Sequence, residues 1–262
     1  CCVRPLFSAE GIGRASARHD HVLVPTPAAV LEGARLLADG IAGREGLGPL
    51  VVVDPGGATT DVHSIGTGEP GEPGVIRYGL PEPYAKRTVE GDLGMRHNAA
   101  TIVAAVGLEA LATDAGLAPG VAGNALLRIE ANVGMLPATD IELQLDEALV
   151  RAAVDIAMKR HAGTVETVYT TQGPVQVQRG KDLSAVGWLI GTGGAIVHAR
   201  NPASILAVGC GDARSPGSLR PRAPRLAVDA DYLLYAAGLL AQVDPVAAFD
   251  CARNHLRLLP RA

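Results

Sequence analysis

This sequence has few aromatic side chains and no excess of positive charge. Phe, Trp and Tyr make up 3 % of the 262 residues, so a sandwich anchored by aromatic residues is a poor fit and a layered α/β domain is a better one. Lys and Arg number 23 against 27 Asp and Glu, which gives a net charge of −4. Because that balance produces no field to attract a polyanion, we expect no nucleic-acid partner.

Long apolar runs and paired cysteines are missing as well. No run approaches the roughly 18 residues that a membrane span needs, and no signal peptide opens the chain, so we expect no membrane partner. The cysteines are Cys1, Cys2, Cys210 and Cys251, and none forms a C-x-x-C pair. We therefore expect reduced thiols in a cytoplasmic protein.

Glycine and hydrophobic residues are plentiful: 32 glycines gather at particular turns, and 48 % of the chain is hydrophobic. Periodicity and turn residues predict alternating helices and strands. The predicted strands are 50–53, 62–65, 75–79, 164–171, 175–179, 185–190 and 204–208. The predicted helices are 27–40, 98–106, 122–131, 145–159, 195–199, 231–240 and 245–258. The whole stretch 84–161 is helical in character, and residues 211–228 are predicted to form a loop.

The first motif with chemical content is DPGGATTD at residues 54–61, placed at the tip of a predicted hairpin. Glycines at such a tip allow a ligand to approach the backbone, and successive N–H groups can bind phosphate oxygens. Asp54 and Asp61 are oxygen ligands of the kind that Mg²⁺ prefers. The alternative is a plain turn in which the aspartates cap backbone N–H groups.

The second motif is GTGG at residues 191–194, between a predicted buried strand and a helix. That context suits nucleotide binding, because a helix N-terminus favours anionic groups. The spacing matches neither the dinucleotide fingerprint nor a P-loop, which disfavours both of those folds. A tight strand–helix turn without a ligand is the alternative.

Charged residues concentrate in a third segment, KRTVEGDLGMR at residues 86–96. Glu90 or Asp92 is able to orient a water or a metal ion, while the neighbouring basic residues offset phosphate charge. The alternative is the solvated start of a charged helix. His63, on a predicted strand, is expected to be partly buried and hydrogen bonded.

Together the motifs resemble the second lobe of the actin/Hsp70/sugar-kinase ATPase superfamily, over about residues 22–241. Within that superfamily, the segments 54–64, 86–96, 180–183 and 190–194 look like the glutamate-mutase-associated MutL family, whose members are regarded as ATP-driven accessory or reactivating proteins of cobalamin-dependent mutases. The resemblance implies a ribonuclease-H-like α/β lobe, with a mixed sheet flanked by helices. It also implies three parts: residues 1–47 with a first connecting helix, a nucleotide-binding lobe at 48–210 with an inserted subdomain at about 107–145, and residues 211–262 with a second connecting helix.

The resemblance further implies ATP and Mg²⁺ as cofactors and a cobalamin-dependent mutase as partner. Asp54 and Asp61 would hold the metal, and Asp54, Glu90 and Asp92 would serve catalysis. The nucleotide contacts would be Gly56, Gly57, Thr59, Thr60, Gly191, Thr192, Gly193 and Gly194.

The superfamily's first lobe, with its own phosphate loop, has no counterpart before Asp54. Since phosphoryl transfer needs charges on both sides of the phosphates, we expect weak nucleotide binding and little or no hydrolysis from this chain by itself. Two alternatives stay open: a small-molecule kinase of the same superfamily, and a catalytically silent module that docks on a partner.

Overall fold

A mixed six-stranded sheet forms the centre of the computed structural model, which describes residues 26–260. The strands lie in the order β11-β10-β9-β3-β4-β6. Their bounds are β3 Leu50–Pro55, β4 Thr60–Ile65, β6 Ala85–Glu90, β9 Trp188–Gly191, β10 Arg225–Asp229 and β11 Leu256–Leu258. Strands β3, β9 and β10 are parallel, whereas β4 runs antiparallel to β3 and β6, and β11 runs antiparallel to β10.

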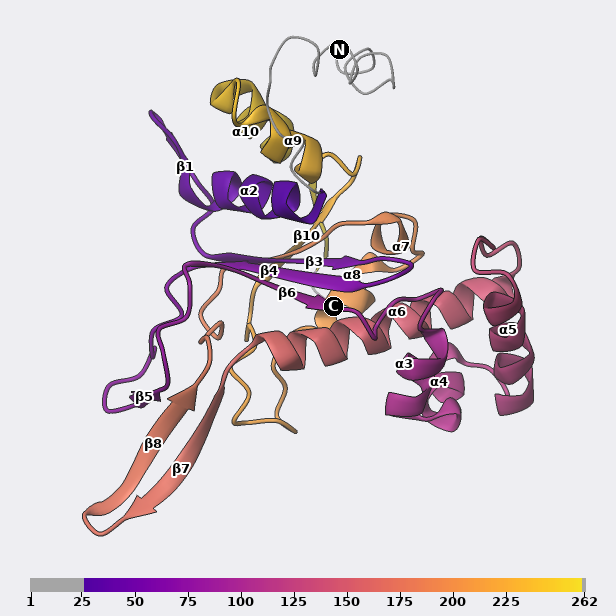
Figure 1. The fold of residues 1–262 in the computed structure, drawn as a ribbon, viewed down its shortest axis with the longest axis horizontal. Coiled ribbons are helices and arrows are strands. Elements are labelled where there is room, and N and C mark those ends of the chain that lie inside the picture. Colours follow the sequence, from indigo (N-terminus) through magenta and orange to yellow (C-terminus); the bar gives the residue numbers. More distant parts are fainter. Residues whose placement is uncertain (1–25, 261–262) are drawn as a thin grey trace.

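Helices cover both faces of this sheet, because its central strand is apolar on both sides (Figure 1). Val51 and Val53 pack on one side, and Leu50 and Val52 on the other. The first side carries α3 Ala99–Val106, α4 Leu108–Ala115, α5 Pro119–Ala131, α6 Asp140–His161, α7 Gly194–Val197 and α8 Pro202–Ala207. The second side carries α2 Thr26–Asp39, α9 Leu234–Leu240 and α10 Pro245–Asn254, with the short strands β1 Gly40–Ile41 and β2 Arg44–Glu45 after α2.

Helices α2 and α9, the two predicted connecting helices, lie against each other (Figure 1). Their backbones touch through glycines: a Cβ on Gly33 would overlap the carbonyl oxygen of Leu234, and one on Gly238 would overlap that of Ala29. Glycine is therefore required at both positions for this close approach. Pro25, the predicted entry to α2, lies outside the described residues, as do Cys1 and Cys2.

The longest helix, α6, begins after Thr139, at a capping-box signal in its sequence. Thr139 and Glu142 form a capping box in which the Glu142 side chain accepts a hydrogen bond from the Thr139 backbone N–H. Basic residues fill the last turn, where they complement the helix dipole. The helix then delivers its C-terminal residues Arg160 and His161 beneath strands β4 and β6.

A second sheet projects from the body as an arm (Figure 1), with strand order β5-β8-β7. Its strands are β5 Ile76–Tyr78, β7 Thr164–Thr170 and β8 Gly173–Arg179. Lys181, directly after β8, fixes the arm to the main sheet. Its buried ammonium donates hydrogen bonds to the carbonyl oxygens of Ser64 at 3.2 Å, Pro83 at 2.9 Å and Tyr84 at 2.7 Å.

Several predicted elements are wrong, each for a local reason. Residues 85–90, expected to be helical, form strand β6, because they pair with β4 along its whole length. Residues 204–208, expected as a strand, fall largely in α8, which Asn201 caps and Pro202 starts. The predicted loop 211–228 ends in strand β10, and the last predicted helix stops at Asn254 before β11. The predicted hairpin at 50–65 is confirmed.

Candidate functional site

The two glycine motifs meet at the carboxyl edge of the main sheet. Strands β3 and β9 are parallel neighbours with Val53 opposite Gly191, and the Thr192 N–H donates to the Val53 carbonyl at 3.0 Å. Gly193 follows with φ at +86°, and a Cβ there would overlap Oδ1 of Asp54. The two motifs therefore lie side by side at this edge, as the resemblance implies for residues that contact one nucleotide.

The carbonyl groups at the hairpin tip accept hydrogen bonds from the segment that follows β6. Met95 N–H donates to the Gly56 carbonyl at 3.1 Å, and Arg96 N–H donates to the Gly57 carbonyl at 2.9 Å. Arg96 is itself held to α6 by a two-pronged ion pair with Asp146. With the carbonyls turned inward, the N–H groups of Gly57 and Ala58 donate no hydrogen bond within residues 26–260. The tip thus presents donors, as an anion-binding turn requires.

Asp54 and Asp61 face each other across the hairpin and lie on the same face of the sheet. Burial and the charges of Asp61 and Asp229 raise the pKa of Asp54 to about 6. Burial also raises the pKa of Asp61, against the opposing effect of Arg87, whose Nη2 lies 3.5 Å from Oδ2. Oδ1 of Asp61 is buried without a hydrogen-bond partner. Two crowded carboxylates with an unpartnered oxygen are an environment that a cation would stabilise.

This donor set suits Mg²⁺ rather than a caged metal. Among residues 26–260, no group of three or more His, Cys, Asp or Glu side chains is placed to hold a metal ion. Mg²⁺ keeps several waters and is usually held by one or two carboxylates together with substrate phosphates. Asp54 and Asp61 fit that role beside a turn whose Gly57 and Ala58 N–H groups donate no hydrogen bond within residues 26–260.

The hydroxyl groups of the two motifs already have partners. Thr60 Oγ1 donates to the Leu93 carbonyl at 2.7 Å, and Thr192 Oγ1 donates to Asp229 Oδ2 at 2.9 Å. Asp229 also accepts the N–H groups of Leu233 and Leu234, so it links the GTGG turn to the start of α9. Gly191 is buried, and a Cβ there would press on Ile196 and Leu206. These residues and the buried Gly193 shape the site, which leaves the backbone of Gly57 and Gly194 with the side chain of Thr59 as its accessible surface.

Glu90 and Asp92 are bound to Arg160 at the end of α6. Arg160 Nη1 lies 2.7 Å from Glu90 Oε2 and 2.7 Å from Asp92 Oδ1, and Nη2 lies 2.9 Å from Asp92 Oδ2. Hydrogen bonds from Arg160 lower the pKa of Asp92, so it is a weaker base than a free carboxylate. The geometry favours a structural ion cluster over water activation.

Sequence analysis missed Asp229 and Tyr232, two residues near Asp54. The charge of Asp229 acts on Asp54, and the charge of Asp54 acts on Tyr232. Tyr232 has φ at +54°, unusual for a bulky residue, and burial together with the charge of Asp54 raises its pKa to about 12. The signal was the short apolar run 226–228 followed by an aspartate, the same strand-to-aspartate pattern that marks Asp54.

The expectation for His63 is wrong. Its ring is fully buried, and neither ring nitrogen has a hydrogen-bond partner. Burial and the nearby Arg87 charge lower its pKa to about 3, so it is neutral at physiological pH. The hydrogen-bonded histidine is instead His161, which contacts Ser64 Oγ and Thr88 Oγ1, each at 2.8 Å.

Two other features bear on the expected class of protein. Within residues 26–260, every helix is too short or too polar to cross a lipid bilayer. Cys210 and Cys251 are free thiols, and burial raises the pKa of both, which argues against a reactive thiolate at Cys210.

Comparison with known proteins places these motifs in a family. The chain is 44 % identical over 257 residues to "Protein MutL" of Clostridium tetanomorphum, an alignment that covers 97 % of this chain and 55 % of that protein. It thus spans about half the length of this curated relative. The family model described as "MutL protein" matches residues 2–256. The chain, a mixed α/β protein with its two glycine turns at one sheet edge, therefore belongs to the MutL family.

Proposed function

We propose that this chain is the ATP-binding part of a chaperone-like accessory protein that reactivates a cobalamin-dependent mutase of the glutamate mutase type. The observation that carries the proposal is the meeting of the two glycine turns over the buried, raised-pKa carboxyl group of Asp54. Family membership supports the mutase partner. The proposed fold is an actin/Hsp70-type ATPase lobe, which the mixed sheet with helices on both faces supports.

Each side of the sheet edge has its own role in the proposal. The N–H groups of the 56–59 turn bind phosphate oxygens, and Gly193 and Gly194 border the adenosine. Asp54 and Asp61 hold Mg²⁺, which neutralises phosphate charge when bound. Tyr232, next to Asp54, forms the wall of the site toward α9.

The proposed work is mechanical rather than chemical. Helices α2 and α9 are in close contact at Gly33 and Gly238. In the proposal this helix pair is the hinge about which a second lobe rotates. In the proposal, ATP closes the two lobes and the motion opens the partner enzyme. Because Glu90 and Asp92 are both hydrogen bonded to Arg160, no free carboxylate of that segment activates a water. Hydrolysis by this chain alone is therefore expected to be slow.

Calorimetric titration with ATP, with and without Mg²⁺, tests the proposal. We expect weak binding that Mg²⁺ strengthens, and loss of the Mg²⁺ effect in Asp54→Ala. Glu90→Gln serves as the matched control, since it removes a carboxylate that contacts Arg160 instead of the turn. Absence of any ATP binding would contradict the proposal, and rapid turnover that depends on Asp54 would contradict its mechanical reading.

The second candidate is a silent docking module, and the Arg160 cluster is the observation in its favour. Glu90 and Asp92 are both paired with Arg160, so this cluster needs no nucleotide to be stable. The same titration separates the two, because a docking module would bind its partner without any response to ATP.

A further inference from the structure

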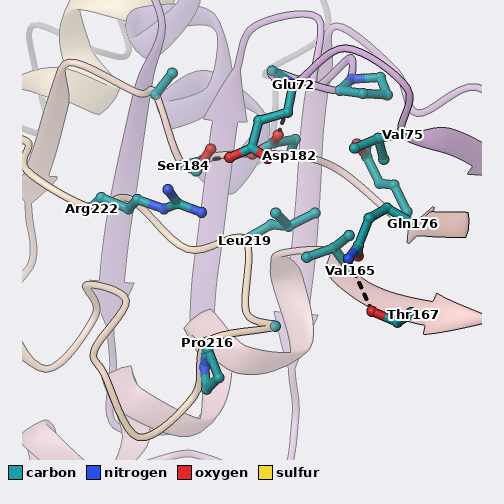
Figure 2. Close-up of a pocket in the computed structure, with 15 residues that line it drawn as sticks. Glu72, Val75, Val165, Thr167, Gln176, Asp182, Ser184, Pro216, Leu219 and Arg222 are labelled. Carbon is teal, nitrogen blue, oxygen red and sulfur yellow. Dashed lines mark hydrogen bonds between the residues drawn. The ribbon is translucent and has the colours of Figure 1, made fainter. Parts of the chain in front are cut away.

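A cleft lies at the opposite end of the main sheet from Asp54. Its volume is about 700 Å³, within the range of clefts that hold drug-sized ligands. Strands β7 and β8 of the arm line one wall, and loops around residues 70–75, 182–185 and 216–222 line the others (Figure 2). Ser184 and Ala185 precede β9, so this cleft is at the amino end of that strand, whereas the GTGG turn is at its carboxyl end.

A buried amide in the cleft lacks half of its hydrogen bonds. Gln178 is 1 % exposed, and its Nε2 donates to the carbonyl oxygens of Gly68 and Gly180, each at 2.9 Å. Those two bonds fix the orientation of the amide. Its Oε1 accepts no hydrogen bond from any described residue and keeps some contact with solvent, so it is open to a donor from the cleft. A ligand with an N–H group would supply it.

A free cation lies at another wall of the cleft. Arg222 is exposed, points into the cleft in Figure 2, and forms no ion pair within residues 26–260. Between it and β7 the floor is apolar, with Leu219 and Val165 (Figure 2). A guanidinium beside an apolar floor binds a carboxylate on an otherwise apolar molecule.

A simple anion is a poor fit to the same cleft. Glu72 and Asp182 also line it, so the three charged side chains sum to a negative charge. Both oxygens of Asp182 are engaged, with the N–H groups of Gly71 and Ser184 at 3.2 Å and 2.8 Å. Glu72 forms no ion pair in the described part of the chain and is free to meet a basic group. The charges therefore complement a molecule that carries both signs.

We propose that this cleft binds a short extended peptide, with a carboxylate on Arg222, a backbone N–H on Gln178 Oε1 and a basic group near Glu72. A free amino acid would satisfy the charges but would leave most of the volume empty. Inorganic phosphate would satisfy Arg222 alone. The proposal does not depend on the nucleotide site, which lies at the other end of the strands.

The test is titration of the chain with a four-residue peptide, lysine–valine–valine–glutamate, followed by amide chemical shifts. Arg222→Gln is the test variant, and Arg214→Gln is the matched control, because Arg214 lies in the same loop, is 91 % exposed and contacts only Asp212. We expect shifts confined to residues 70–75, 165–178, 182–185 and 216–222, with affinity about tenfold weaker in Arg222→Gln and unchanged in Arg214→Gln.

Three results would overturn the proposal. One is no shift at about 5 mM peptide, which is weaker than any specific site of this kind. Another is equal affinity of wild type and Arg222→Gln. The third is full competition by free amino acids or inorganic phosphate at the same concentration, which would reduce the cleft to a general anion or amino-acid site. MgATP binding should be the same in all these variants, so failure here leaves the nucleotide proposal intact.

Discussion

Two buried charges at opposite ends of the same sheet have very different surroundings. Lys181, at the base of the arm, directs its ammonium at three carbonyl oxygens. Burial lowers its pKa to about 8, so it stays charged at neutral pH. Asp54, at the carboxyl edge, accepts no hydrogen bond from the described residues, and its pKa is raised by burial and by Asp61.

The difference separates structure from function. A buried charge whose hydrogen bonds are all made within the chain stabilises the fold, and its removal leaves its partners unsatisfied. A buried carboxyl group beside a second carboxylate destabilises the fold unless something outside the chain neutralises it. By this criterion Lys181 is a structural residue and the Asp54 edge is a place for a ligand.

The largest effect is expected from Lys181→Met. The substitution leaves three buried carbonyl oxygens without a donor, so the free energy of unfolding should fall by about 3–5 kcal/mol. Urea denaturation followed by circular dichroism measures it. A loss below about 1 kcal/mol would show that water replaces the ammonium and that the comparison does not hold.

The next effect compares two glycines with nearly the same backbone. Gly193 and Gly107 have φ, ψ of 86°, 150° and 87°, 139°, but a Cβ on Gly107 has nothing within 4 Å, whereas one on Gly193 overlaps Asp54 Oδ1. Gly107→Ala should cost about 1–3 kcal/mol through backbone strain alone.

Gly193→Ala should lose a further 1–3 kcal/mol or so because of the overlap, and it should abolish ATP binding. Thermal unfolding and calorimetry check both parts. Equal losses in the two variants would show that the contact between Gly193 and Asp54 is unimportant.

Asp54→Asn should stabilise the fold while weakening Mg²⁺-dependent ATP binding. The pKa of Asp54 is raised from 3.8 to about 6 in the folded state, so ionisation opposes folding by about 3 kcal/mol above pH 6. The gain from Asn should shrink as pH falls from 6 toward 4, where the folded-state carboxyl group is protonated. Unfolding curves at pH 4 and pH 7.5 test this, and a variant less stable than wild type at pH 7.5 would contradict it.

The smallest effect is expected from Glu90→Gln and Asp92→Asn. Both carboxylates contact the partly exposed Arg160, and exposed ion pairs contribute less than about 1 kcal/mol each. ATP binding should not change. A loss of binding equal to that of Asp54→Ala would restore their predicted catalytic role.

The hairpin and the proximity of the glycine turns could be predicted because their residues leave few local choices. Residues 50–53 are a continuous apolar run of one leucine and three β-branched valines, and the glycines that follow end it. Strand β6 could not be predicted, because its sequence AKRTVE has no alternation of apolar and polar residues and becomes extended through backbone pairing with β4. Strand β10 was missed because the predicted proline-rich loop 211–228 includes most of it. Asp229 and Tyr232, which end and follow this strand, were missed for the same reason.

The roles of single side chains were the least predictable part of the site. Glu90 and Asp92 read as free acids in the sequence, but Arg160 is about 70 residues away along the chain and becomes their partner only through the fold. Thr60 was likewise predicted to contact the nucleotide, yet its hydroxyl donates a hydrogen bond to the Leu93 carbonyl. Long-range partners of this kind are invisible to spacing.

The most direct measurement is a comparison of amide chemical shifts with and without MgATP. If the two glycine turns bind one nucleotide, the amides of Gly57 and Gly193 should shift together, with the same concentration dependence, and in Asp54→Ala both should need a higher MgATP concentration to shift. Shifts in only one of the two turns, or at unrelated concentrations, would contradict a shared nucleotide site.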